Sequence, residues 1–185
     1  MMTEISLNVL DIAENSVRAN ANLIQICITI SSEEDTLTIT ILDNGCGMSG
    51  EQLDKVKDPF YTTRTTRSIG LGIPFFKQAA ESTDGDFTIT SDLGVGTLVK
   101  AVFKLSHIDR MPLGDMTSTI HALITLNTNI DFLYIYTVDE KSFTLDTREF
   151  RKILGDIPFS EYEISSYIKE YLNENKAEVD NGRYF

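Results

Sequence analysis

The spacing of hydrophobic residues changes along the first part of the chain. Between Ile5 and Arg18, apolar or small residues recur three and four positions apart, which predicts a helix. We expect Thr3 to cap this helix and Asn20 to end it in a left-handed conformation. From Leu23 to Ile30, and again from Thr36 to Leu42, apolar residues occupy alternate positions, as they do in half-buried strands. A short polar stretch joins the two runs, so we expect an antiparallel pair of strands.

The rest of the pattern predicts further helices and strands. The pair Ser49 and Gln52 has the spacing of a capping box and predicts a helix that runs to Lys57. Pro74 suits the first turn of a second helix, which opens near Gly70. The remaining predicted elements are a hairpin at 87–91 and 97–104, a linker at 108–114, a helix at 115–126, strands at 132–138 and 142–145, and helices at 148–154 and 160–174. The chain should therefore contain a larger unit, residues 1–107, and a small α+β unit, residues 115–185.

Charge narrows the classes of partner. The 185 residues include 16 Lys and Arg against 28 Asp and Glu, a formal net charge of −12. Such a surface repels phosphate backbones and anionic lipid, so neither nucleic acid nor a membrane is an expected partner. The longest apolar run, Leu23 to Ile30, is too short to cross a bilayer, and the N-terminus does not resemble a signal peptide. Cys27 and Cys46 lack the spacing of a metal or redox motif and indicate free thiols in the cytoplasm.

Asp11 and Asn15 are the first candidates for chemistry. They lie four residues apart on the predicted helix, so their side chains point the same way. A carboxylate and a carboxamide on one face can coordinate a hard cation or position a water molecule. Taken alone, the pair is also typical of an ordinary solvated helix face.

Asp43 follows an apolar strand and precedes Gly45 and Gly47. A carboxylate in this position can accept a hydrogen bond from the exocyclic amine of adenine, whereas guanine would present a second acceptor there. The two glycines would let the backbone approach a flat base. The alternative is a simple Asp-Asn-Gly turn.

Gly70 and Gly72 lie where a loop becomes a helix, and free N–H groups at a helix N-terminus favour phosphate. Arg64, Arg67 and several threonines precede them in an otherwise acidic chain. The alternative is a flexible polar loop.

The order and spacing of these features together resemble the ATPases shared by DNA gyrase, the ninety-kilodalton heat-shock chaperones, histidine kinases and mismatch-repair proteins. Five segments carry the resemblance: Asp11-Ile12-Ala13-Glu14-Asn15-Ser16-Val17-Arg18-Ala19, Asp43-Asn44-Gly45-Cys46-Gly47-Met48, Pro59-Phe60-Tyr61-Thr62-Thr63-Arg64, Ile69-Gly70-Leu71-Gly72-Ile73 and Gly94-Val95-Gly96-Thr97.

The resemblance implies a fold, cofactors and site residues. The fold would be α+β, a two-layer α/β sandwich of the histidine-kinase-like (Bergerat) type, followed by the small α+β extension. The cofactors would be ATP and Mg²⁺, with Asn15 holding the metal and Asp43 holding the adenine amino group. The expected nucleotide-binding residues are Asn15, Ala19, Asp43, Gly45, Gly47, Met48, Phe60, Thr62, Thr63, Arg64, Gly70, Leu71, Gly72, Ile73 and Thr97.

One position departs from the pattern. The gyrase and chaperone branches carry a water-activating Glu four residues before the Asn, and here that position is Asp11, one methylene shorter. Asp11 is therefore the candidate catalytic residue, either in slow hydrolysis or in phosphotransfer.

Two functions remain open at this stage. The chain resembles a standalone histidine- or serine-type protein kinase that acts on a protein partner. The alternative is an ATP-switched binding module, with a homodimer among its candidate states. His107 has the spacing to Arg110 and Pro112 of a phospho-acceptor box, although a coincidence within the linker explains that spacing as well.

Overall fold

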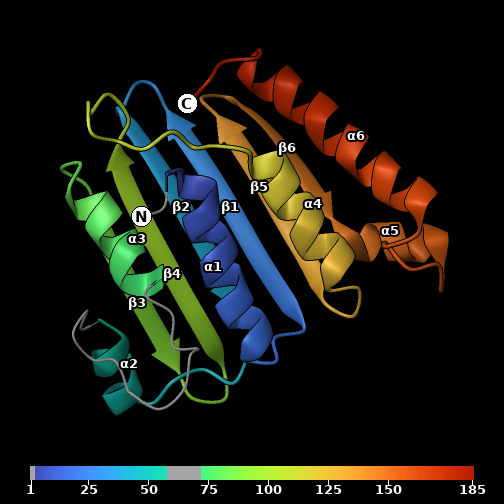
Figure 1. Ribbon diagram of the computed structural model, residues 1–185, viewed down its shortest axis with the longest axis horizontal. Coiled ribbons are helices and arrows are strands. Elements are labelled where there is room, and N and C mark those ends of the chain that lie inside the picture. The colour runs from blue at the N-terminus through green and yellow to red at the C-terminus, as the bar shows by residue number, and fades with distance from the viewer. Residues whose placement is uncertain (1–2, 58–71) are drawn as a thin grey trace.

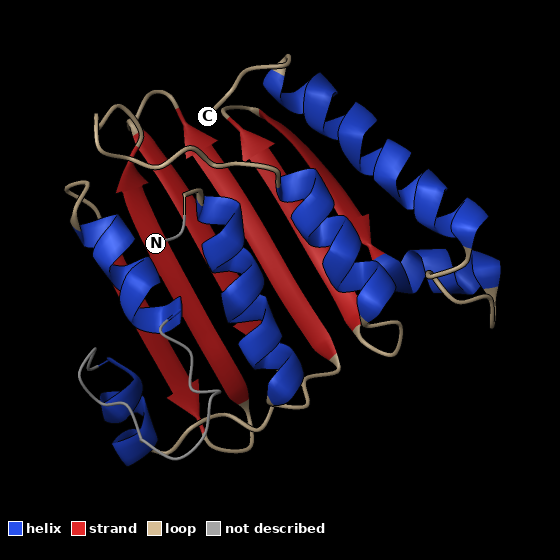
Figure 2. Ribbon diagram, in the orientation of Figure 1, coloured by secondary structure: helices blue, strands red, loops and turns tan. Residues whose placement is uncertain are grey.

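The computed structural model describes residues 3–57 and 72–185. They form one six-stranded sheet with helices α1, α3, α4 and α6 packed against one of its faces (Figures 1 and 2). This two-layer α+β arrangement confirms the predicted fold class. The elements, in chain order, are α1 (Ile5–Arg18), β1 (Leu23–Ser31), β2 (Thr36–Asp43), α2 (Gly50–Lys57), α3 (Gly72–Glu81), β3 (Asp86–Asp92), β4 (Gly96–Lys104), α4 (Met116–Leu126), β5 (Asp131–Val138), β6 (Lys141–Asp146), α5 (Thr147–Leu154) and α6 (Tyr162–Asp180).

The strands follow the order β3-β4-β2-β1-β5-β6. β1 pairs with β2 in the antiparallel sense and with β5 in the parallel sense, and the remaining neighbours are antiparallel. The alternating residues of β1 and β2, among them Ile28 and Ile39, are fully buried beneath the helices. Strands β5 and β6 thus extend the sheet that the first part of the chain begins. The predicted boundary between two units at residues 108–114 stays a prediction. Strands from both sides of this boundary belong to one sheet.

The segment that joins β4 to α4 passes over the first turn of α1 (Figure 1). The backbone N–H groups of Ile5 and Ser6 donate to the carbonyls of Pro112 and Leu113, each at 2.9 Å. These carbonyls satisfy donors that a side-chain cap would otherwise serve. The prediction that Thr3 caps α1 is therefore wrong, since the cap position is Glu4 and its side chain makes no capping hydrogen bond.

Other local predictions are confirmed. Asn20 has a left-handed φ of 56° just beyond α1. The capping box of α2 is present, because the Ser49 N–H donates to Gln52 Oε1 and the Gln52 N–H donates to Ser49 Oγ.

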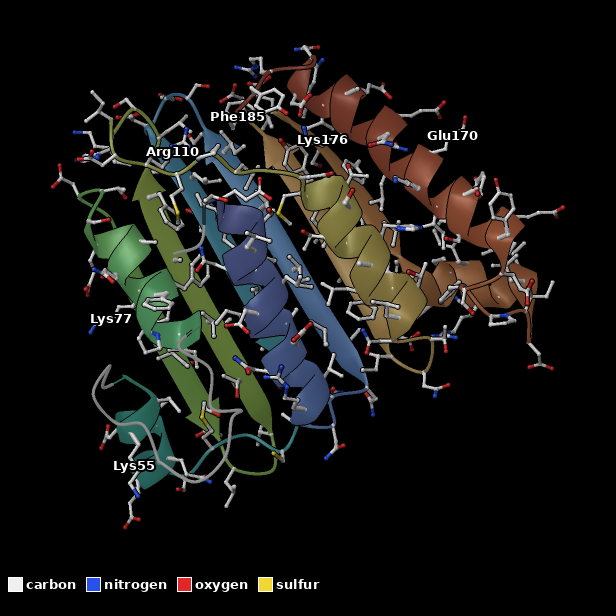
Figure 3. The ribbon with its side chains drawn as sticks, in the orientation of Figure 1. Lys55, Lys77, Arg110, Glu170, Lys176 and Phe185 are labelled. Carbon is white, nitrogen blue, oxygen red and sulfur yellow. The ribbon has the colours of Figure 1, made fainter. Side chains whose placement is uncertain are left out.

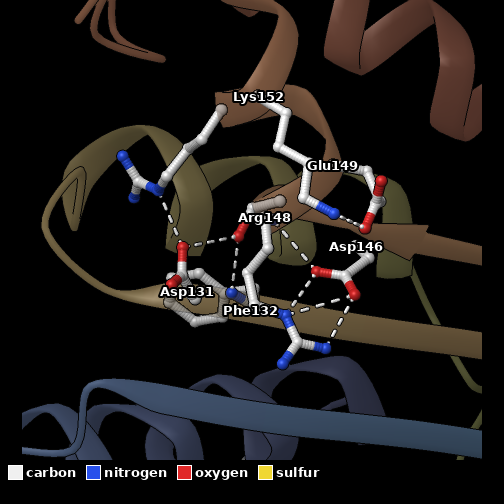
Figure 4. Close-up of polar contacts among 8 residues, drawn as sticks. Asp131, Phe132, Asp146, Arg148, Glu149 and Lys152 are labelled. Atoms are coloured by element: carbon white, nitrogen blue, oxygen red, sulfur yellow. Dashed lines mark hydrogen bonds and ion pairs between the residues drawn. The ribbon is translucent and has the colours of Figure 1, made fainter. Parts of the chain in front are cut away.

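Polar contacts fasten α5 to the sheet (Figure 4). Asp146 caps α5 by accepting from the Arg148 N–H at 3.0 Å, and the Arg148 guanidinium Nη2 lies 2.7 Å from the same carboxylate. The hydrogen bond from this guanidinium lowers the pKa of Asp146. A second contact joins α5 to the strand β5, because Arg151 Nε on the helix donates to the Asp131 carboxylate on the strand at 2.7 Å.

The last helix, α6, is longer than predicted. It continues to Asp180 rather than ending at 174, because its final turn is held by buried contacts. The Asp180 carboxylate is fully buried and accepts hydrogen bonds from the Tyr136 hydroxyl and from Lys176 Nζ. Asn181 then ends the helix with a φ of 54°.

Candidate nucleotide-binding site

A cavity of about 380 Å³ lies between α1, the start of α3 and the ends of β2 and β4 that adjoin the β3–β4 turn. Its walls are largely apolar, and its polar groups are concentrated where α1 meets β2. The lining residues are Ile12, Asn15, Ser16, Arg18, Ala19, Ile41, Asp43, Cys46, Gly47, Met48, Gln52, Val56, Ile73, Thr97 and Val99.

Asp43 is the buried acid of this cavity, with 7% of its surface exposed. Ser16 Oγ donates to Oδ2 at 2.6 Å, and the Gly45 N–H donates to Oδ1 at 2.8 Å. Each oxygen has one protein donor and keeps acceptor capacity for a further donor. The carboxylate is therefore held in a fixed orientation, with lone pairs available to a group inside the cavity.

Thr97 lies directly opposite Asp43 in the β2–β4 register. Its hydroxyl Oγ1 is 2.9 Å from Ser91 Oγ. Ser91 Oγ accepts from the Met48 N–H at 2.9 Å and donates to the Gly96 carbonyl at 2.9 Å. A hydroxyl has one hydrogen, so when Ser91 donates to the carbonyl, Thr97 donates to Ser91. Thr97 then offers only lone pairs to the cavity, as Asp43 does.

The α1 wall carries Asn15 and Arg18. Arg18 Nη1 donates to Asn15 Oδ1 at 3.0 Å, and Nη2 donates to Glu14 at 2.9 Å. Asn15 is half-buried, whereas Arg18 is exposed at the rim of the cavity. This corner therefore combines a carboxamide oxygen with a cation.

Gly47 holds the loop after β2 against the β3–β4 turn. Its φ is +64°, and a Cβ there would strike the Asp92 carbonyl. The nearby Gly94 N–H donates to the Cys46 carbonyl at 2.7 Å. A Cβ on Gly45 would likewise meet Ala19 and Asp43. In the described residues, both glycines thus serve close approach between protein segments.

Asp11 lies beside the start of α3. A Cβ at Gly72 would overlap the Asp11 carboxylate, so a larger residue there would require the Asp11 side chain to move. Negative charge is favoured at a helix N-terminus, which accounts for the position of this half-buried acid. Asp11 and Gly72 adjoin the cavity without being part of its lining.

The structure brings most of the described candidates together. Those that line the cavity are Asn15, Ala19, Asp43, Gly47, Met48, Ile73 and Thr97. Gly45 binds the Asp43 carboxylate through its N–H. Six candidates lie outside the described residues, namely Phe60, Thr62, Thr63, Arg64, Gly70 and Leu71.

Sequence reasoning missed several residues of the site. Ser16 belongs to the apolar and small face predicted for α1, and its hydroxyl also donates to Asp43. Ile41 and Val99 lie two residues from Asp43 and Thr97 on the same strands, so alternation could have found them. Ser91 gave no signal, since its role depends on the pairing of β3 with β4.

The cavity fits an adenine nucleotide. Apolar walls suit the faces of a flat base, and two acceptors suit an amino group at its edge. Among residues 3–57 and 72–185, no cluster of three or more His, Cys, Asp or Glu side chains could hold a metal ion alone. Mg²⁺ commonly takes one or two protein oxygens together with phosphates and water, and Asn15 can supply such an oxygen.

No helix among the described residues is both long and apolar enough to pass through a membrane.

Comparisons with known proteins agree with this geometry. The chain is 32% identical over 81 residues to the probable C4-dicarboxylate sensor kinase of Bacillus subtilis, covering 44% of this chain and 15% of that protein. It is 28% identical over 96 residues to sporulation kinase C of the same organism, covering 52% and 22%. The chain thus spans under a quarter of these relatives.

Solved structures share the fold at low sequence identity. The ATPase domain of Aquifex aeolicus MutL, complexed with ADP, matches with a TM-score of 0.53 and 13% identity, over 83% of this chain and 70% of that one. The N-terminal domain of a DNA repair protein matches with a TM-score of 0.56 and 16% identity, over 78% and 53%.

The family model of the histidine kinase-, DNA gyrase B- and HSP90-like ATPases matches residues 3–107. This match covers more than half of the chain and includes the whole of the cavity, so the protein belongs to that ATPase family, whose domain implies ATP binding.

Proposed function

We propose that this protein binds ATP with Mg²⁺ in the cavity and transfers the γ-phosphate to a protein, as a histidine- or serine-type kinase of the cytoplasm. The observation that carries the nucleotide assignment is the buried Asp43, fixed by Ser16 and Gly45 and facing Thr97 across the β2–β4 pair. The similarity to sensor kinases supports the transfer of phosphate to protein.

Asp43 and Thr97 would select adenine. Both present acceptors, and the adenine amino group carries two hydrogens that can satisfy them, directly or through a water molecule. Guanine would place its carbonyl oxygen against two acceptors. An unpaired buried acceptor costs about 1–3 kcal/mol, which corresponds to roughly 5- to 150-fold in affinity.

Asn15 and Arg18 would serve the phosphate end of the nucleotide. The Asn15 carboxamide oxygen can hold Mg²⁺, which neutralises charge on the phosphates when it is bound. Arg18 can exchange its present contacts with Asn15 and Glu14 for phosphate oxygens, because it is exposed at the rim. The assignments of Phe60, Thr62, Thr63, Arg64, Gly70 and Leu71 to nucleotide binding remain part of this proposal.

Asp11 would accept a proton from the group that receives the phosphate. It lies one turn before Asn15 and beside the start of α3, where phosphate would also be attracted. The shorter arm of Asp11 favours a second candidate function, an ATP-switched module that binds a protein partner or a second copy and hydrolyses ATP slowly.

We infer that His107 does not receive phosphate from the cavity of its own molecule. It follows β4 at the end opposite Gly96, and a strand of this length spans about 25 Å. Its Nδ1 accepts from the Asp109 N–H at 3.2 Å, which gives this ring a local structural role.

The test is to follow the label from γ-labelled ATP. The protein, incubated with Mg²⁺ and an extract of cells that express it, should place label on a protein band. Asp11→Asn should reduce this transfer, while Asp11→Glu should retain hydrolysis. Label found only as free phosphate or on bound ATP would contradict the kinase and favour the binding module.

A further inference from the structure

Arg18 is the one basic residue in the described lining of the nucleotide cavity. The buried acid Asp43 lines the same cavity, and Asp11 adjoins it. A triphosphate carries several negative charges, so it is attracted by the guanidinium and repelled by these carboxylates. The attraction of the described lining for the phosphate end of a nucleotide therefore depends on whether the Arg18 guanidinium is available.

The Arg18 guanidinium contacts two neighbours on α1. Nη2 donates to Glu14 Oε2 at 2.9 Å, and Nη1 donates to Asn15 Oδ1 at 3.0 Å. Glu14 lies four residues before Arg18, the spacing at which opposite charges on one helix pair. The second contact covers the carboxamide oxygen proposed to hold Mg²⁺. Arg18 is thus held by an acid on one side and occupies a candidate metal ligand on the other.

A bound phosphate would compete with Glu14 for these N–H groups. Guanidinium binds phosphate best through two parallel N–H groups, and Nη1 and Nη2 both have protein acceptors here. The side chains of Arg18 and Glu14 are 49% and 48% exposed, so water screens their ion pair and the pair can be exchanged. Glu14 can therefore reduce phosphate binding without preventing it.

From these contacts we propose that Glu14 is a positioning residue that holds Arg18 against Asn15 and thereby lowers the affinity of the cavity for phosphate. This inference rests on the proposed function, because it takes Arg18 as a contact of the phosphates. On nucleotide binding, Arg18 would move from Glu14 to the phosphate oxygens. The same movement would uncover Asn15 Oδ1 for Mg²⁺, so that metal and nucleotide bind together.

Titrations with ATP and with adenosine, both in the presence of Mg²⁺, separate the phosphate end of the ligand from the base. Glu14→Ala should bind ATP about two- to fivefold more tightly than the parent, because an exposed ion pair no longer has to be broken. Its affinity for adenosine, which has no phosphate, should stay the same. Unchanged or weaker binding of ATP by Glu14→Ala would overturn the proposal.

A double-mutant cycle shows whether Glu14 acts through Arg18. In the Arg18→Ala background, the further change Glu14→Ala should give no gain in ATP affinity, because no guanidinium is left for Glu14 to hold. An equal gain in both backgrounds would mean that the charge of Glu14 repels the phosphates directly. That result would overturn the positioning role.

Glu81→Ala is the matched control for the loss of charge. Glu81 pairs with Lys77 at the same four-residue spacing on α3. Figure 3 shows Lys77 on the side of α3 that faces away from α1. Glu81→Ala removes the same charge from an exposed ion pair, and it should leave the affinity for ATP unchanged. A gain equal to that of Glu14→Ala would assign the effect to net charge and contradict the proposal.

The contact between Glu14 and Arg18 can also be measured without nucleotide. In NMR spectra of the full chain, the Arg18 guanidinium signals should shift in Glu14→Ala, and those of the parent should shift when ATP is added. Unchanged Arg18 signals in Glu14→Ala would overturn this inference and leave the proposed function intact. If the parent did not bind ATP, the proposed function would fail together with the effect of Glu14 on phosphate, and only the contact would stand.

Discussion

Replacing Asp43 by Asn removes one negative charge and almost no volume. The Gly45 N–H can still donate to the remaining oxygen, and the Ser16 hydroxyl can rotate to accept from the new amide. Both protein contacts of Asp43 can therefore persist in the variant. The apo fold should change little, whereas the acceptor available to a base would be weakened.

The expected magnitude follows from the contact that is lost. A hydrogen bond to a charged group contributes about 1.5–3 kcal/mol, so ATP affinity should fall roughly 10- to 150-fold in Asp43→Asn. An amide hydrogen turned toward the adenine amino group would add repulsion between two donors.

Isothermal titration with ATP and Mg²⁺ measures this change, and a thermal melt without nucleotide confirms that the variant is folded. Asp92→Asn, at the exposed end of β3, serves as a control for the loss of charge. Should folded Asp43→Asn bind ATP within twofold of the parent, the assignment of Asp43 to the base would be refuted.

Three further perturbations test the account. Ser91→Ala frees the Thr97 hydroxyl to donate, so the preference for ATP over GTP should fall about tenfold in competition assays, while Thr88→Ala on the same strand should leave it unchanged. Gly47→Ala forces a left-handed φ and a clash with a backbone carbonyl, and should cost roughly 2 kcal/mol or more, a loss of about 4–8 °C in melting temperature. The Arg148 hydrogen bond depresses the pKa of Asp146 in the folded state. The stabilisation of the fold by this contact is therefore complete above the unfolded pKa of about 4, and it is lost as pH falls through the folded pKa. Asp146→Asn keeps the helix cap and should therefore show a smaller decline in melting temperature between pH 5 and pH 2, and an identical decline would contradict this reasoning.

The sequence predicted several helices and strands well, because the features that determine them involve residues close together in sequence. The three- and four-residue spacing of α1 and the alternation of β1 and β2 record burial against a single layer. The Ser49–Gln52 capping box also needs only neighbours in sequence. Thr3 failed as a cap because the donors of α1 are satisfied by Pro112 and Leu113, which are distant in sequence.

The sequence motifs identified individual residues of the site. They did not identify the hydrogen bonds between these residues and others that are distant in sequence. Asp43 and Asn15 were identified from spacing and resemblance, and both line the cavity. Ser91 could not be identified, since only the β3–β4 pairing brings it beside Thr97. The parallel pairing of β1 with β5 was likewise invisible, because alternation indicates a strand without naming its neighbour.

The most direct test of the central claim is a competition titration of the wild-type chain with ATP and GTP in the presence of Mg²⁺. The acceptor pair of Asp43 and Thr97 predicts saturable binding of ATP at one site, at least roughly fivefold tighter than GTP. Equal affinity for the two nucleotides, or no saturable binding of ATP, would contradict the account.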